Sequence, residues 1–200
     1  LARTQWGITL PPQSPFALVS LLKVNNERDI TLSDEQLEKL INEAGKVYIK
    51  SSRQKIIGKA NWLPDMIMFA VATAARFSEI TGLLRKDVDF SRRLATFRNT
   101  KNGDDRVIPL SDEALRILKK QPFGDKFFNV KSREAFKNYW NRARAAAGLS
   151  NFRFHDLRSL AIRKMILSGM QTIEVAKISG HKQLSVLHRR YSRIQPEDLL

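Results

Sequence analysis

Six residues distributed along the chain have side chains suited to work on a phosphate ester. They are two arginines, two histidines, a lysine and a late tyrosine: Arg76, Lys101, His155, Arg158, His181 and Tyr191. A tyrosyl oxygen can act as a nucleophile, and a lysine or a histidine can transfer protons. Arginines can neutralise the non-bridging oxygens through bidentate hydrogen bonds. The inventory is therefore that of an attack on a phosphodiester without a metal ion.

Arg76 stands in ATAARFSEITG, between a very apolar stretch and Phe77. A charge in such a place needs a partner or a ligand, because burial of an unpaired charge is costly. Glu79 follows three residues later and is the obvious partner. Taken by itself, this pattern favours a structural salt bridge over a functional arginine.

Lys101 and the pair His155 and Arg158 have equally ordinary explanations when each is considered alone. Lys101 lies in TKNGDDR, at the tip of a predicted hairpin, where a lysine is normally just solvated. His155 and Arg158 are three residues apart, on one face of the first turn of a predicted helix. The N-terminus of a helix favours an anion such as phosphate. The alternative for this pair is a simple surface contact.

The last two candidates lie close to the C-terminal end of the sequence. His181 follows Ser179 and Gly180, and the glycine is expected to end a helix. Tyr191 stands in HRRYSRI, among arginines that can lower the pKa of a phenol and hold a phosphate beside it. A packing role is the usual explanation for an isolated tyrosine. Metal binding is not expected, because the three histidines have neither cysteine nor suitably spaced carboxylates to complete a site.

The overall composition indicates a folded domain that binds a polyanion. The net charge is +15 over 200 residues, and the hydrophobic fraction of 42% is enough for a real core. Nucleic acid is the commonest partner of so basic a chain. The absence of cysteine fits a reducing cytoplasm. No stretch approaches the ~18 apolar residues of a membrane span, so no membrane partner is expected.

Hydrophobic periodicity predicts a mainly helical fold with a small three-stranded antiparallel sheet, an α+β arrangement. A capping box, Ser33 with Gln36, opens the first predicted helix, and Asn102-Gly103 marks a hairpin between the last two strands. Predicted helices cover 33–48, 61–75, 78–84, 112–120, 132–147, 156–167, 172–180 with Thr172 as its cap, and a last turn from 184 towards 191. Predicted strands cover 87–90, 94–100 and 105–110.

The helix over 132–147 is basic and amphipathic. Its cations are Arg133, Lys137, Arg142 and Arg144. They fit a contact with the DNA backbone and a solvated face about equally well.

The order Arg, Lys, His-x-x-Arg, Gly-His and Tyr resembles the tyrosine recombinases, also called the phage integrase family. ATAARFSEITGLLRKDVDF looks like the first arginine box of that family, and TKNGDDRVIPL looks like its lysine hairpin. FHDLR is similar to the second box, and SGH followed by Tyr is similar to the closing box. The resemblance covers about residues 30–195. Three positions depart from it: Ala74 replaces a frequent Gly, Ser159-Leu160 replaces an aromatic or His, and Ser179 replaces a frequent Leu.

The resemblance implies a role for each of the six residues. Arg76, Arg158 and His181 would hold the scissile phosphate. Lys101 would be the general acid for the 5′-hydroxyl, and His155 would be a general base or would orient the nucleophile. Tyr191 would form the 3′-phosphotyrosyl bond. That bond conserves the energy of the phosphodiester, so no cofactor is expected.

The resemblance also implies a domain organisation and a set of partners. Residues 1–28 would be the end of a truncated N-terminal core-binding domain with its linker, and 29–200 would be the catalytic domain with a C-terminal tail. The expected partners are double-stranded DNA, three further copies of the protein in a tetramer, and accessory DNA-bending proteins. A bacterial or phage protein working at the nucleoid is expected.

Two other functions remain open at this point. A type IB topoisomerase uses similar groups on a related catalytic fold but relaxes DNA as a monomer. A non-catalytic DNA-binding module would use Tyr191 only for packing.

Overall fold

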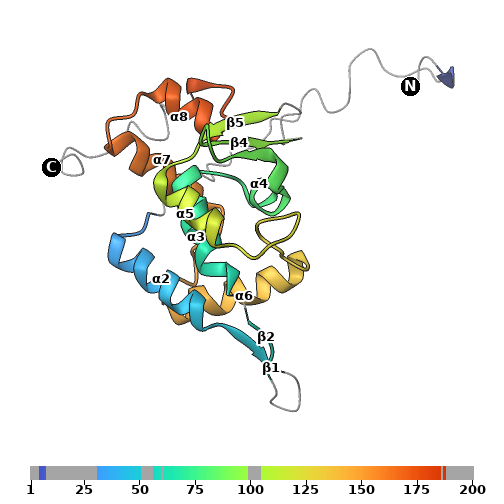
Figure 1. Cartoon of the computed structure of the whole chain (residues 1–200), viewed down its shortest axis with the longest axis vertical. Helices are drawn as coiled ribbons and strands as arrows, with labels where there is room; N and C mark the ends of the chain where they lie inside the picture. The colour runs from blue at the N-terminus through green and yellow to red at the C-terminus, as the bar shows by residue number, and fades with distance from the viewer. Residues whose placement is uncertain are drawn as a thin grey trace.

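Helix α3 (Trp62–Thr73) is the central element of the fold, as Figure 1 shows. The computed structural model describes residues 5–7, 31–50, 56–59, 61–98, 105–185 and 187. The sequence of α3 is apolar on nearly every side, so the helix can be covered all round. Leu63, Met66 and Phe69 are fully buried in it, and α2, α5 and α7 pack against it. The core of the domain is therefore built around this one helix.

Serine hydroxyls begin three of the surrounding helices. Ser33, Ser111 and Ser132 each accept a hydrogen bond from a backbone N–H three residues later. This satisfies an amide that has no partner within the helix. The three helices are α2 (Asp34–Lys46), α5 (Asp112–Lys120) and α6 (Arg133–Ala146). The capping box predicted at Ser33 and Gln36 is confirmed.

The remaining helices carry or support the candidate residues. Short helix α4 (Phe77–Gly82) follows α3 directly and leads into a 3₁₀ turn, η1 (Arg85–Asp87). Helices α7 (Asp156–Leu167) and α8 (Thr172–Ser179) pack against each other. A small apolar cluster, which includes Ala74, Ile162 and Val175, lies between them and the end of α3.

The predicted three-stranded sheet is present. Strands β3 (Val88–Asp89), β4 (Leu94–Phe97) and β5 (Arg106–Pro109) are antiparallel and lie in that order. Leu94 pairs with Pro109, and Phe97 pairs with Arg106. The predicted turn at Asn102-Gly103 lies outside the described residues. The fold class predicted from the sequence is confirmed.

Two local predictions were wrong. The first helix was expected to reach Tyr48, but α2 ends at Lys46, and a separate hairpin of β1 (Tyr48–Lys50) and β2 (Ile56–Lys59) follows. This hairpin projects from the lower end of the molecule in Figure 1. The cap of α8 is Gln171 with Glu174 rather than Thr172, because this pair forms a capping box one residue earlier.

Within the described part of the chain, no helix is long and apolar enough to cross a membrane.

Candidate active site

Arg158 joins three segments that are far apart in the sequence. Its Nη1 donates to the carbonyl of Ala74 at 2.6 Å, and its Nη2 donates to the carbonyl of Ser179. Nη2 also lies 3.5 Å from Nδ1 of His181. Only 4% of Arg158 is exposed, so the alternative of a surface His–Arg pair is wrong for this residue. The second arginine box, the end of α3 and the Gly-His segment therefore meet at one guanidinium group.

The two carbonyls that hold Arg158 lie at helix C-termini. Ala74 is the C-cap of α3, and Ser179 is the last residue of α8. The C-terminal end of a helix carries a partial negative charge and carbonyls without a helical partner. These oxygens position Arg158 without the full neutralisation that a carboxylate would bring.

Glu79 organises the first arginine box. Its Oε2 accepts from the backbone N–H of Arg76 at 2.7 Å, and its Oε1 accepts from Nη1 of the same arginine at 2.8 Å. The side chain of Glu79 is 3% exposed, while that of Arg76 is 19% exposed. The predicted salt bridge is confirmed. This salt bridge fixes the backbone N–H and one guanidinium nitrogen of Arg76. Part of the guanidinium group remains accessible.

Arg106, on β5, is a third arginine of the corner formed by Arg76, Glu79 and Arg158, and it is not among the residues predicted from the sequence. Its Nη2 donates to Oε2 of Glu79, and its Nη1 donates to the carbonyl of Ile178 on α8. Its guanidinium also lies over the ring of Phe97, 5.0 Å from the centroid. Burial lowers the pKa of Arg106, and Arg76 adds to that effect, while Glu79 opposes it. Arg106 thereby ties the sheet to both α4 and α8.

A period-2 reading of the strand could have found Arg106. Side chains alternate between the two faces of a strand, and the burial of β5 follows that rule, with Arg106 and Ile108 inside. Ile108 is clearly a core residue, so Arg106 had to share its face. At the end of α8 the Arg106 side chain packs against Gly180. A Cβ added at Gly180 would stand 2.9 Å from the Arg106 Cδ. Gly180 also has a φ of +73°, which favours glycine.

The charges of this corner do not cancel. Arg76 and Arg106 share the carboxylate of Glu79, and Arg158 is held by carbonyls, so these four side chains together carry a net charge of two positive. Two of the arginines are nine-tenths buried or more. In surroundings of low dielectric constant such an excess strongly favours an anion. The corner is therefore suited to a phosphate group.

The other candidates are placed only in part. His155 is exposed and stands just before α7, where the Asp156 carboxylate accepts from the Arg153 backbone N–H at 2.8 Å. His155 and the buried Arg158 thus begin the same helix but differ in burial. Lys101 and Tyr191 lie outside the described residues, and their roles stay predictions.

The four cations predicted on α6 differ in burial. Arg133, Lys137 and Arg142 are exposed. Arg144 instead donates to the carbonyls of Ser150 and Phe152, at 2.5 and 3.2 Å, and closes the turn after the helix. Arg144 therefore has a structural task, and only the exposed three still fit either a contact with DNA or a solvated surface.

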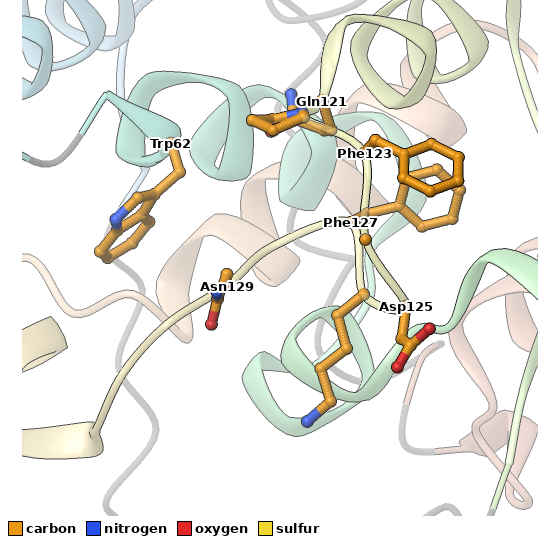
Figure 2. Close-up of a pocket in the computed structure, with 9 residues that line it drawn as sticks. Trp62, Gln121, Phe123, Asp125, Phe127 and Asn129 are labelled. Atoms are coloured by element: carbon orange, nitrogen blue, oxygen red, sulfur yellow. The ribbon is translucent and has the colours of Figure 1, made fainter.

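A pocket on another part of the surface is distinct from this corner. It lies between the start of α3 and the segment 121–129, and Figure 2 shows Trp62 on one side of it and Phe123 and Phe127 on the other. None of the candidate catalytic residues lines it. The described residues also contain no cluster of three or more histidine, aspartate or glutamate side chains that could hold a metal ion.

Comparison with known proteins agrees with this geometry. The sequence model of the phage integrase family matches residues 30–198. The chain belongs to the phage integrase family. The Shufflon-specific DNA recombinase of Escherichia coli is 30% identical over the whole of this chain and 49% of its own length. The chain thus spans about half the length of this member of the family.

Two solved structures of phage integrases share the fold. The catalytic domain of the bacteriophage HP1 integrase has a TM-score of 0.63 at 23% identity, over 83% of this chain and 88% of that one. A lambda integrase dimer bound to a COC′ core site has a TM-score of 0.62 at 22% identity, over 82% and 60%. The arrangement of α3, α7, α8 and the three-stranded sheet is therefore a phage integrase fold.

Proposed function

We propose that this chain is the catalytic part of a site-specific DNA recombinase that cleaves and rejoins DNA through a 3′-phosphotyrosyl intermediate. The observation that carries the proposal is the meeting of Arg158 with the segments of Arg76 and His181 in a corner of net positive charge. Residues 74 and 158 are 84 positions apart, so only the fold brings the boxes together. Family membership supplies the reaction type.

The proposed reaction is an in-line exchange at phosphorus. The Tyr191 oxygen forms a bond to the phosphorus while the bond to the 5′-oxygen breaks. His155 takes the proton of the phenol, and Lys101 gives a proton to the departing 5′-oxygen. Arg76, Arg158 and His181 bind the non-bridging oxygens, whose negative charge grows in the transition state. Attack by a 5′-hydroxyl on the phosphotyrosine reverses these steps and rejoins the strand.

The proposed substrate is double-stranded DNA. The names of the relatives, a DNA recombinase and an integrase on its core site, support this, as does the charge of +15. We further propose assembly into a tetramer on DNA, with accessory DNA-bending proteins, in the bacterial cytoplasm. Residues 29–200 are then the catalytic domain, and 1–28 belong to a core-binding domain and its linker.

A covalent trap tests the proposal. The protein, in the longest form that its gene encodes, is incubated with nicked, fragmented host and phage DNA, quenched with detergent, and its DNA-linked fraction is sequenced. A 3′-linked adduct is expected, and it should disappear in Tyr191→Phe. Arg158→Lys should keep DNA binding and lose most of the adduct, because a lysine cannot reproduce the forked contacts.

Three other results would count against the proposal. Tight, salt-sensitive DNA binding without any adduct would indicate a binding module. Adducts at random sequences with relaxation of supercoils would indicate a topoisomerase. An adduct that persists in Tyr191→Phe would mean that another residue is the nucleophile.

A further inference from the structure

Ser179, the last residue of α8, lies against His181. Its Oγ is 2.7 Å from Nδ1 of the imidazole and 2.6 Å from the carbonyl oxygen of Val175. The side chain is fully buried, so no solvent exposure competes for these contacts. Ser179 stands where the family resemblance leads one to expect a leucine, which has no polar atom to offer.

The number of protons on the Ser179 hydroxyl and on the Val175 carbonyl determines which group donates each hydrogen bond. A serine hydroxyl has one proton, whereas a backbone carbonyl can only accept. At 2.6 Å from Val175 the hydroxyl must donate to that carbonyl, because otherwise two oxygen lone pairs would face each other. Such a bond to the carbonyl four residues earlier is common for serine in helices. The Oγ is then left as an acceptor towards His181.

The nearby arginine does not reverse this assignment. Arg158 Nη2 can only donate; one of its two protons goes to the carbonyl of Ser179, and only the other could reach His181. Its distance of 3.5 Å from His181 Nδ1 is much longer than the 2.7 Å of the serine contact. We infer that Ser179 is a positioning residue that holds His181 with its proton on Nδ1.

This tautomer has a consequence that rests on the proposed function. With Nδ1–H directed to Ser179, neutral His181 presents a lone pair on Nε2, which repels a phosphate oxygen. His181 can donate to the phosphate only when both ring nitrogens carry protons. Protonated His181 becomes the reactive form, so cleavage should fall as the pH rises through the pKa of this imidazole.

The charges around His181 determine where that pKa lies. Arg158 from α7 disfavours the imidazolium, and so do Arg106 from β5, which adjoins Gly180, and the neighbouring Lys182. Glu79 offsets part of this through Arg106. A bound phosphodiester favours the imidazolium.

Nitrogen NMR of the imidazole rings tests the tautomer without DNA. Protonated and lone-pair ring nitrogens give separate ¹⁵N signals, and the chain has only three histidines, so His181→Asn identifies the relevant pair. The neutral wild-type ring should carry its proton on Nδ1. In Ser179→Ala and Ser179→Leu it should move to Nε2, because Arg158 is then the described donor facing Nδ1. An unchanged tautomer in both variants, or Nε2–H in the wild type, would overturn the inference.

The pH profile of cleavage tests the consequence. Wild-type cleavage should fall about tenfold for each pH unit above the pKa of His181, and that fall should disappear in Ser179→Ala. Ser179→Thr keeps a hydroxyl and should restore the wild-type profile. Identical profiles for the wild type and Ser179→Ala would show that the tautomer has no part in the reaction. If the wild type does not cleave, the proposed function fails, while the NMR result still decides the tautomer.

Discussion

Around helix α6 the described structure is held by aromatic rings, and around Arg158 it is held by charges and carbonyls. Near α6, Phe136 contacts Trp62, Phe77, Trp140 and Phe154, with ring centroids 4.4 to 6.3 Å apart. These contacts bury large apolar rings against one another. Around Arg158, each guanidinium is fixed by oxygens at defined distances. The two regions adjoin at Phe77, which follows Arg76 in the chain and packs against Phe136 with 4.4 Å between ring centroids.

The difference separates stability from chemistry. Apolar burial stabilises in proportion to area and does not require one exact geometry. A site for a phosphate needs cations close together, which repel one another and resist burial. Here one carboxylate and the carbonyls at two helix ends offset the repulsion between the arginines. These oxygens fix the guanidinium groups but do not fully neutralise their charge. Mutations in the two regions should therefore fail in different ways.

The largest effect is expected from Glu79→Leu. It leaves Arg106 buried without its carboxylate, which should cost about 3–5 kcal/mol of unfolding free energy. It also releases Arg76, and misplacement of such a group should slow cleavage by about 100-fold or more. Urea unfolding and the covalent trap measure the two effects. Arg116→Gln breaks an exposed pair with Glu113 and should cost no more than about 1 kcal/mol. Equal losses in the two variants would contradict the importance of the buried network.

Phe136→Ala should lower stability far more than the rate of cleavage. Truncation of this buried ring is expected to cost about 3–5 kcal/mol. Cleavage per folded molecule should fall much less than in Glu79→Leu, because Phe136 reaches Arg76 only through Phe77. Rates are compared under conditions where urea titration shows both proteins folded. A large loss of rate in fully folded Phe136→Ala would mean that the two regions are coupled.

The contact between Gly180 and Arg106 should give an intermediate effect. Gly180→Ala adds a Cβ that must displace the Arg106 side chain, at a cost of about 1–3 kcal/mol beyond the strain of a positive φ. Gly169→Ala is the matched control, since its φ is +87° and nothing lies within 4 Å of its added Cβ. That control should show only the strain, about 1–2 kcal/mol. Similar losses of stability for both would mean that Arg106 moves aside freely.

The aromatic region was largely predictable from the sequence, and the charged corner was not. Apolar spacing and hydroxyl caps are local signals, so the sequence predicts α2, α3, α6 and α7 with errors of one or two residues at their ends. Local pairing also revealed Glu79 as the partner of Arg76. The bonds from Arg106 to Glu79 and from Arg158 to Ala74 span 27 and 84 positions, and no local pattern encodes them.

The hairpin of β1 and β2 was not predicted from the sequence for a different reason. Val47 and Tyr48 continue the apolar spacing of α2, so the periodicity does not show where the helix stops. Val47 is instead an extended C-cap residue, and the chain pairs with β2 from the next position. Tertiary context overrides a helical pattern most easily at such an end.

The smallest effect is expected at Ala74, where the sequence departs from the glycine of the family pattern. Ala74 has a φ of +52°, so glycine would relieve about 1–2 kcal/mol of strain. Glycine would also remove a buried methyl group, worth about 0.8 kcal/mol, and add about 0.4–1 kcal/mol of chain entropy to the unfolded state. Ala74→Gly should therefore change the unfolding free energy by less than about 1 kcal/mol.

Ala70→Gly is the matched control for that prediction, because Ala70 is buried in the same helix. It loses a methyl group and helix propensity without relief of strain, so it should cost about 1.5–2 kcal/mol in a urea titration. The carbonyl of residue 74 remains available to Arg158 in both variants, and cleavage should be unchanged. A clear loss of cleavage in Ala74→Gly alone would show that the left-handed alanine, and not only its carbonyl, is needed to aim Arg158.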